Sequence, residues 1–195
     1  MENSELLVAT NLIYQKKTKE KIYYDNNFYE MVNYEKSNQK FLLEIKRKFD
    51  SLINKLNLNF IIEEANKKNI RKVLNKIYYY KNVDSPRPLH IDTYNNSIKF
   101  FLACNSIHKI HDGPYSVIPG SHKKKSILKL MELYNKYLRS NIWFDKFDGS
   151  FFSSSDAFIF FTDPGDLIIT RQNAIHGDFP TVNKTKRTMI VKHYL

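Results

Sequence analysis

The fold of this chain is decided by residues 163–170, which read D-P-G-D-L-I-I-T. Proline presets the φ angle of the first central residue of a type II turn, and glycine permits the positive φ of the second, so residues 163–166 are predicted to form a tight turn. The β-branched residues that follow favour a short strand over 166–170. A turn that leads directly into a short strand is typical of antiparallel sheets.

The same pattern of turns and short predicted strands extends from Pro86 to the C-terminus. Pro119-Gly120 predicts a second type II turn. Further stretches rich in β-branched and aromatic residues are predicted strands, at residues 98–104, 115–118, 157–161 and 188–194. Short strands separated by turns favour an antiparallel sandwich or barrel, so residues 86–195 are predicted to form a β core.

Residues 1–80 are predicted to be mainly helical, because apolar residues recur there with helical spacing. The first such stripe is Phe41, Leu42, Ile45, Phe49, Leu52, Ile53 and Leu56. A second helix is expected over 61–77, with Ile62, Ala65, Ile70, Val73, Leu74 and Ile77 on one face. Stripes of this kind are usually packing surfaces, so these helices are expected to cover one face of a sheet. We treat residues 1–195 as a single domain.

An insertion interrupts the β region. Residues 126–141 are predicted to be helical, with Ile127, Leu130, Met131, Tyr134, Tyr137 and Leu138 on one face, and residues 142–156 are predicted to be a loop. The segment 126–156 either closes over a substrate or is an ordinary packing helix followed by a solvent loop.

Residues 90–92 read H-I-D, and a second histidine, His176, lies far downstream. In a strand, side chains two residues apart point to the same face, so His90 and Asp92 can reach one metal ion while Ile91 packs behind. Two imidazoles and one carboxylate form the facial triad of non-haem Fe(II) oxygenases, which leaves coordination positions open. Taken singly, each of these residues has an ordinary structural or surface role as the alternative.

Arg187 lies in the predicted strand 186–191. An always-charged guanidinium in an apolar strand needs a carboxylate or phosphate partner, because an unpaired buried charge is costly. The distal carboxylate of 2-oxoglutarate would be such a partner, and an acidic neighbour within the chain is the alternative.

Several segments together resemble a known family. H-I-D (90–92), D-G-P-Y-S-V-I-P-G-S-H-K (112–123), G-D-L-I-I (165–169), H-G (176–177) and Arg187 are similar, in order and spacing, to the phytanoyl-CoA dioxygenase family of Fe(II)- and 2-oxoglutarate-dependent oxygenases. The resemblance covers residues 86–195, and the segment 112–123 is its most specific part.

The resemblance implies a fold and a set of roles. The fold would be mainly β, a double-stranded β-helix (a cupin-like jelly roll) capped by N-terminal helices. The iron ligands would be His90, Asp92 and His176, and Arg187 would hold the C5 carboxylate of 2-oxoglutarate. With Fe(II), 2-oxoglutarate and O2, the chain would hydroxylate a small or carrier-linked metabolite and release succinate and CO2.

Five further residues adjoin these segments. Lys99 is a candidate contact to the cosubstrate, with an exposed surface lysine as the alternative. Weaker candidates for the substrate pocket are Thr93, Tyr94, Arg171 and Gln172.

The chain departs from the family pattern at Asp178, where members often have a small residue such as serine two positions after the distal histidine. An acid there would repel a dianionic cosubstrate unless it points away or is neutralised, and Lys99, Lys184 and Lys186 are candidate partners. Asp92 favours hydroxylation, because halogenating relatives have a small residue in place of that carboxylate. His193 disfavours the nucleobase demethylases, which usually carry a second arginine six positions after the first.

A competing metal cluster of His108, His111 and His122 is disfavoured, because no carboxylate-bearing strand frames these loop histidines. His193 is expected to be structural.

Charge and composition leave a second class of function open. The chain has 31 Lys and Arg against 20 Asp and Glu, a net charge of +11, which favours anionic partners or simply reflects an AT-rich genome. A catalytically inactive jelly roll that binds an anionic ligand or nucleic acid is therefore the alternative. The single cysteine, Cys104, is expected to be an inert core thiol. With no export signal or long apolar run, the chain is expected to act in the cytoplasm, away from membranes.

Overall fold

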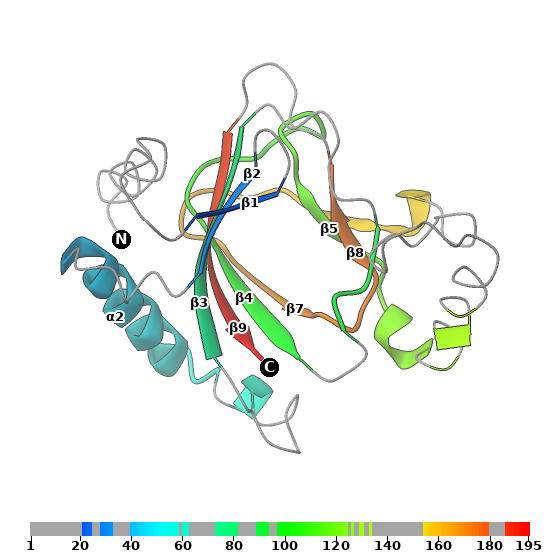
Figure 1. The fold of residues 1–195 in the computed structure, drawn as a ribbon, viewed down its shortest axis with the longest axis horizontal. Coiled ribbons are helices and arrows are strands. Elements are labelled where there is room, and N and C mark those ends of the chain that lie inside the picture. Colours follow the sequence, from blue (N-terminus) through cyan, green and yellow to red (C-terminus); the bar gives the residue numbers. More distant parts are fainter. Residues whose placement is uncertain are drawn as a thin grey trace.

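Two β-sheets lie face to face in the computed structural model of the chain (Figure 1). The structure describes residues 21–24, 28–32, 40–58, 60–62, 73–81, 89–93, 97–124, 126, 129–130, 133, 154–179 and 186–195. Its strands are β1 Lys21–Tyr24, β2 Phe28–Val32, β3 Val73–Lys81, β4 Ile98–Ala103, β5 Tyr115–Val117, β6 Phe158–Phe160, β7 Leu167–Arg171, β8 His176–Asp178 and β9 Lys186–Tyr194. The large sheet has the order β1-β2-β3-β9-β4-β7, and the small sheet has the order β6-β5-β8.

The chain alternates between these sheets. From β4 in the large sheet it crosses to β5 and β6 in the small sheet, returns to β7, crosses to β8 and returns to β9. Every strand pairs antiparallel with its neighbours. This winding is the double-stranded β-helix, or jelly roll, that the family resemblance implies. The predicted strands of the β core correspond to β4, β5, β6, β7 and β9.

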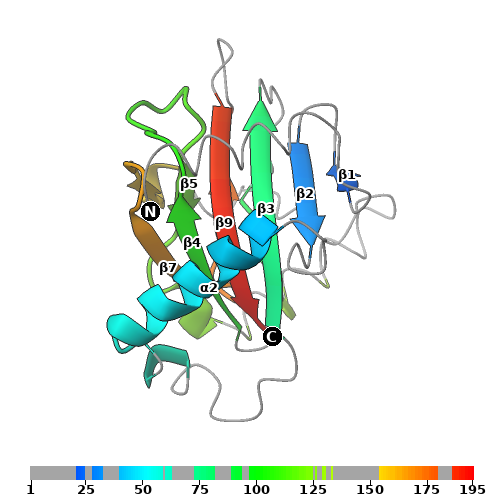
Figure 2. The ribbon, with the colours of Figure 1, turned by 90° about the vertical axis from the view of Figure 1, so that its left-hand side faces the viewer.

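Helix α2, Lys40–Lys55, covers the outer face of the large sheet (Figure 2). Its bounds agree within a residue with the predicted stripe. The residues that it buries against the sheet are spaced as an amphipathic helix requires: Leu42, Ile45, Phe49 and Ile53. Burial of each such side chain contributes on the order of 2 kcal/mol. Leu56, which the stripe included, follows the helix and is 50% exposed.

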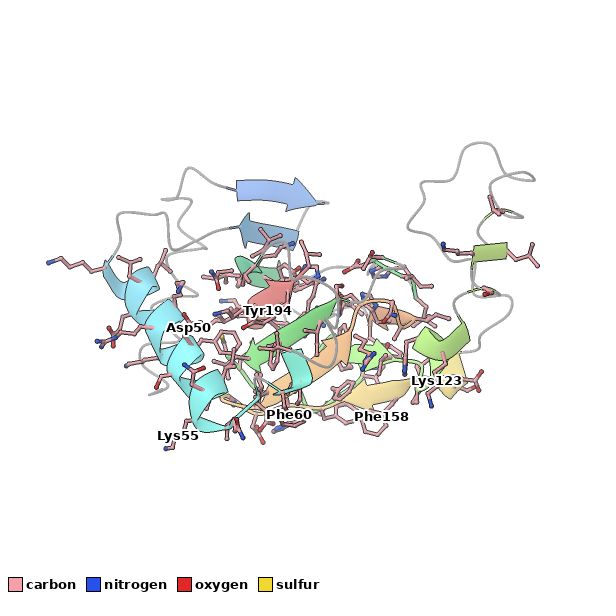
Figure 3. The ribbon with its side chains drawn as sticks, turned by 90° about the horizontal axis from the view of Figure 1, so that it is seen from below. Asp50, Lys55, Phe60, Lys123, Phe158 and Tyr194 are labelled. Atoms are coloured by element: carbon pink, nitrogen blue, oxygen red, sulfur yellow. The ribbon has the colours of Figure 1, made fainter. Side chains whose placement is uncertain are left out.

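An ion pair also joins α2 to the sheet. Lys192 of β9 pairs with Asp50, which Figure 3 shows on the helix beside the sheet, with Tyr194 close by. Burial raises the pKa of Asp50, but its hydrogen bonds with Lys192 and Lys46 outweigh that effect and lower it. The helix is therefore held by a charged contact as well as by apolar packing.

The predicted second helix over 61–77 is wrong over its C-terminal part, because residues 73–81 form β3, and β1 and β2 add two more strands to the predicted helical region. β3 pairs along its whole length with β9, with Val73 opposite Tyr194 and Lys81 opposite Lys186. The burial of Asn75, Ile77 and Tyr79 follows the two-residue period of a strand. Pairing with a distant strand outweighs the local helical spacing, and the aromatic run 78–80 suits a strand.

Both predicted type II turns are present. Gly120 has φ +75° and Gly165 has φ +100°, the positive values that the third turn position requires. The N–H of Ser121 donates to the carbonyl of Ile118, and the N–H of Asp166 donates to the carbonyl of Asp163. The turn at Gly165 leads directly into β7.

Most of the predicted insertion, residues 126–156, lies outside the described residues. Of its predicted apolar face, Leu130 is helical and 68% exposed. In the described part of the chain, no helix has the length and apolar character needed to cross a lipid bilayer.

Cys104 lies in the core beneath α2. Burial raises the pKa of its thiol to about 12. The predicted inert core thiol is therefore confirmed, because a protonated thiol is a poor nucleophile.

Candidate metal centre

A β-bridge brings His90 and His176 side by side across the sequence. The N–H of His90 donates to the carbonyl of His176 at 2.7 Å, and the N–H of His176 donates to the carbonyl of His90 at 2.9 Å. His176 begins β8, so the bridge adds His90 to the edge of the small sheet. The strand predicted for residues 90–92 is reduced to this single bridge residue, because Asp92 already lies in a bend.

The three predicted ligand residues converge. Potential ligand atoms of His90, Asp92 and His176 all lie within 4.8 Å of one another. The Asp92 carboxylate lies 3.2 Å from His90 Nε2 through Oδ1 and 3.7 Å from His176 Nε2 through Oδ2. The two imidazole rings are 4.4 Å apart between centroids. Two imidazole nitrogens and a carboxylate around one position are a donor set that suits a divalent transition metal.

His176 presents one defined nitrogen to this position. Its Nδ1 lies 2.9 Å from the carbonyl of Ala174 and, as the donor, carries the proton, which leaves the lone pair of Nε2 toward Asp92. Burial lowers the pKa of His176, and the nearby Asp92 carboxylate only partly offsets that effect. A neutral imidazole with a fixed tautomer is the form that binds a metal.

Lys99, on β4, is the partner of the Asp92 carboxylate. Its Nζ lies 2.5 Å from Asp92 Oδ2. Burial raises the pKa of Asp92, but the positive charge of Lys99 and the close contacts with both histidines outweigh burial and lower it well below its ordinary range. Asp92 is therefore ionised. The alternative of a surface lysine is wrong, because Lys99 is 5% exposed and lies against the Tyr78 and Phe101 rings.

Arg187, on β9, lies in the same interior and is 2% exposed. Its Nη2 lies 2.9 Å from Asp178 Oδ1, and its Nη1 donates to the carbonyl of Gly113 at 2.5 Å. Its guanidinium stacks 4.0 Å from the centre of the Tyr80 ring. Burial lowers the pKa of Arg187, but the charges and hydrogen bonds of Asp178 and Tyr80 together outweigh burial and raise it, so the guanidinium stays charged.

Asp178 is neutralised by Arg187, which was not among the partners considered for it from the sequence. Lys99 does not neutralise Asp178, because Lys99 pairs with Asp92. Asp178 does not point away from the site either, because it pairs with Arg187. Lys184 lies outside the described residues. The alternative partner considered for Arg187, an acidic neighbour, is thus present in the protein.

The weaker candidates for the substrate pocket differ in how deeply they are buried. Gln172 is fully buried and donates from Nε2 to Thr170 Oγ1 at 2.9 Å, while Thr93 and Arg171 are half-buried. Tyr94 lies outside the described residues. Within the described part of the chain, Gln172 Oε1 has no hydrogen-bond partner.

Two tyrosines near the site were not singled out from the sequence. Tyr115, on β5, has its ring 5.7 Å from the His176 ring and its hydroxyl 3.1 Å from Thr170 Oγ1. Tyr80, on β3, donates its hydroxyl proton to Asp178 Oδ2 at 2.9 Å. Tyr115 lies within the motif 112–123, which offered a signal, whereas Tyr80 was hidden by the helix prediction.

The competing histidine cluster does not form. His108 pairs with Asp163 at 2.7 Å on the surface, and His111 is exposed. Among the residues that the structure describes, only His90, Asp92 and His176 form a group able to hold a metal ion.

Neither a protein-family model nor a curated protein matches the chain. Solved structures share its fold. HygX from Streptomyces hygroscopicus, solved with nickel and 2-oxoglutarate bound, aligns with a TM-score of 0.63 at 14% identity, over 100% of this chain and 79% of HygX. The non-haem α-ketoglutarate-dependent epimerase SnoN from nogalamycin biosynthesis aligns at 0.62 and 10% identity, over 99% of this chain and 72% of SnoN. EvdO2 from Micromonospora carbonacea var. aurantiaca, complexed with 2-oxoglutarate, aligns at 0.57 and 10% identity, over 99% of this chain and 82% of EvdO2. At these identities the alignments establish the shared fold.

Proposed function

We propose that the chain is a non-haem Fe(II)- and 2-oxoglutarate-dependent oxygenase that hydroxylates a small or carrier-linked metabolite. One observation carries the proposal: His90, Asp92 and His176 converge within 4.8 Å in the interior of a jelly roll. A binding module has no need for two imidazoles and an ionised carboxylate around one point. HygX and EvdO2, which share the fold, were solved with 2-oxoglutarate, and this supports the choice of cosubstrate.

The residues around the triad would prepare it for a metal. His90, Asp92 and His176 would hold the ion. By accepting a hydrogen bond from Nδ1–H, the Ala174 carbonyl keeps Nε2 of His176 available. Lys99 holds Asp92 Oδ2 and so leaves Oδ1 toward His90.

The chemistry itself belongs to the cofactors. Fe(II), 2-oxoglutarate and O2 together supply the oxidising power to place one oxygen atom in a substrate C–H bond, with succinate and CO2 as coproducts. Arg187 would anchor the distal carboxylate of the cosubstrate, and the buried Tyr115 and Gln172 would exclude water on the β5 and β7 sides. We propose hydroxylation rather than halogenation because Asp92 keeps the third ligand position.

A small-molecule substrate is supported by the neighbours of the fold. SnoN acts in nogalamycin biosynthesis, and one of its structures holds nogalamycin RO. The net charge of +11 suits an acidic or carrier-linked substrate. The buried cysteine is compatible with a reducing compartment, and we propose the cytoplasm as the place of action.

The second candidate is a catalytically inactive jelly roll that binds an anion. The Arg187–Asp178 pair favours it, because an internally satisfied arginine needs no further carboxylate. This candidate predicts metal-independent binding of an anionic ligand or nucleic acid that weakens steeply with salt.

The test is succinate release coupled to a mass gain of one oxygen in a metabolite pool, measured with anaerobically reconstituted Fe(II) protein after O2 is admitted. We expect both products with the wild-type chain and with His111→Ala, which changes an exposed histidine. His176→Ala should yield neither. Equal succinate release from His176→Ala would contradict the proposed function.

A further inference from the structure

The arginine that would anchor the cosubstrate already holds a carboxylate from its own chain. Arg187 is 2% exposed, and Asp178 Oδ1 lies 2.9 Å from its Nη2. The other terminal nitrogen donates to the Gly113 carbonyl. Both terminal nitrogens of the guanidinium are therefore engaged, and within the described residues its Nε has no hydrogen-bond partner.

Asp178 is held from two sides. Oδ1 faces Arg187, and Oδ2 accepts the hydroxyl proton of Tyr80 at 2.9 Å. Burial raises the pKa of Tyr80 well above its ordinary value, so this hydroxyl remains a donor at neutral pH. Tyr80 and Arg187 are opposite residues of the β3–β9 pair, and Asp178 ends β8 in the small sheet. The contact is thus built by both sheets and is not an accident of one mobile side chain.

The charge of Asp178 determines how the Arg187–Asp178 pair affects the binding of a ligand carboxylate. Lys99 neutralises Asp92, and Arg187 neutralises Asp178, so the interior already has two balanced pairs. A second carboxylate on Arg187 would place two negative charges against one positive charge away from water. Two carboxylates that contact the same guanidinium repel each other strongly in a buried site. A 2-oxo acid without a distal carboxylate meets no such repulsion.

We propose that Asp178 is an internal competitor for the distal carboxylate of the cosubstrate. It occupies Arg187 when no cosubstrate is bound, and it lowers the affinity of the site for 2-oxoglutarate relative to 2-oxo acids that end in an uncharged group. Tyr80 strengthens the competition by holding Asp178 in place. This inference rests on the proposed function and assigns Asp178 and Tyr80 as residues that set cosubstrate specificity.

The experiment is calorimetric titration of the full-length, Ni(II)-loaded protein with 2-oxoglutarate and with pyruvate, which shares the 2-oxo acid group but lacks the distal carboxylate. Ni(II) allows binding to be read without turnover. For Asp178→Asn we expect the Kd for 2-oxoglutarate to fall about tenfold, because one of two competing charges is removed. The Kd for pyruvate should change by less than about threefold, because pyruvate has no group that reaches Arg187. Glu44→Gln, which removes one acidic charge on α2, should leave both constants unchanged.

A second readout does not depend on affinity. In the absence of ligand, Asp178→Asn should melt at a lower temperature than the wild type, because Arg187 loses its charged partner. Should Asp178→Asn fail to fold, Tyr80→Phe keeps both charges and releases only Oδ2, and it should tighten 2-oxoglutarate binding about threefold.

The possible outcomes distinguish a failure of this proposal about Asp178 from a failure of the proposed oxygenase function. Normal Ni(II) binding with an unchanged or weaker 2-oxoglutarate affinity in Asp178→Asn, or in Tyr80→Phe if that variant is the one measured, would overturn the inference and leave the oxygenase proposal standing. Ni(II) binding that is identical in the wild type and His176→Ala would overturn both.

Discussion

The two faces of the large sheet are built from the same strands and do opposite things. On the outer face, Ile98, Phe100 and Leu102 of β4 pack with α2 in an apolar core. On the inner face, β4 contributes Lys99 and β9 contributes Arg187, both buried charges with carboxylate partners. Because side chains alternate along a strand, one backbone supports an apolar core on one side and the candidate site on the other.

The two faces contribute to the free energy of folding in different ways. The outer face gains from apolar burial and has its main ion pair, Lys192 with Asp50, at the half-buried edge of the helix. The inner face takes charged groups out of water, which is costly unless every charge is paired. Substitutions on the outer face should therefore change stability and leave ligand binding intact, whereas substitutions on the inner face should change both.

The largest expected effect is on the outer face. Phe49→Ala removes a side chain of α2 that is 1% exposed and packs in the core against the sheet, and it should lower the free energy of unfolding by about 4 kcal/mol. Urea unfolding measures this loss. Leu43→Ala, at a 47% exposed position of the same helix, is the matched control and should cost less than about 0.5 kcal/mol. A loss of metal affinity in folded Phe49→Ala would break the separation of the two faces.

Arg187→Ala tests the inner face. It leaves the buried Asp178 without its cation, so the free energy of unfolding should fall by about 3 kcal/mol. Anaerobic Fe(II) should still raise the melting temperature of the variant, while the additional rise with 2-oxoglutarate should disappear. Arg47→Ala, at an exposed arginine of α2, should keep both rises. If Arg187→Ala kept the 2-oxoglutarate rise, the anchor role would be lost.

The smallest effect is a pH dependence from the inner face of β9. Burial lowers the pKa of His193 from 6.5 to about 3. Between these values the unfolded chain binds a proton that the folded chain does not, so this stability is fully present above pH 6.5 and is lost as the pH falls through the window. His193→Asn should reduce the acid-induced loss by about 1 kcal/mol near pH 5. His111→Asn is the exposed control, and equal pH profiles for the wild type and His193→Asn would refute the assignment.

Local pattern predicted much of the fold, for reasons that the structure makes clear. Helix α2 could be predicted because its buried residues follow helical spacing. The turns at Gly120 and Gly165 could be predicted because positive φ favours glycine. Strand β3 could not be predicted, because the spacing of Val73 and Ile77 also fits a helix, and the strand conformation depends on pairing with β9. Pairing between distant strands leaves little local trace.

The candidate site was predicted residue by residue but not contact by contact. His90, Asp92 and His176 were identified from the sequence, whereas the bridge that aligns His90 with His176 depends on how β8 meets residue 90. Asp178 and Arg187 were both singled out, yet their pairing could not be foreseen, because it depends on the small sheet lying against the large one. Tyr80, on β3, was missed because residues 1–80 were predicted to be mainly helical.

Anomalous diffraction from crystals grown with Zn(II), a redox-inert probe, tests the central claim most directly. The account predicts one strong anomalous peak about 2.1 Å from Nε2 of His90, Nε2 of His176 and an oxygen of Asp92. The peak should vanish in crystals of His176→Ala. A peak at the surface pair His108–Asp163 with none between the two imidazoles would contradict the account.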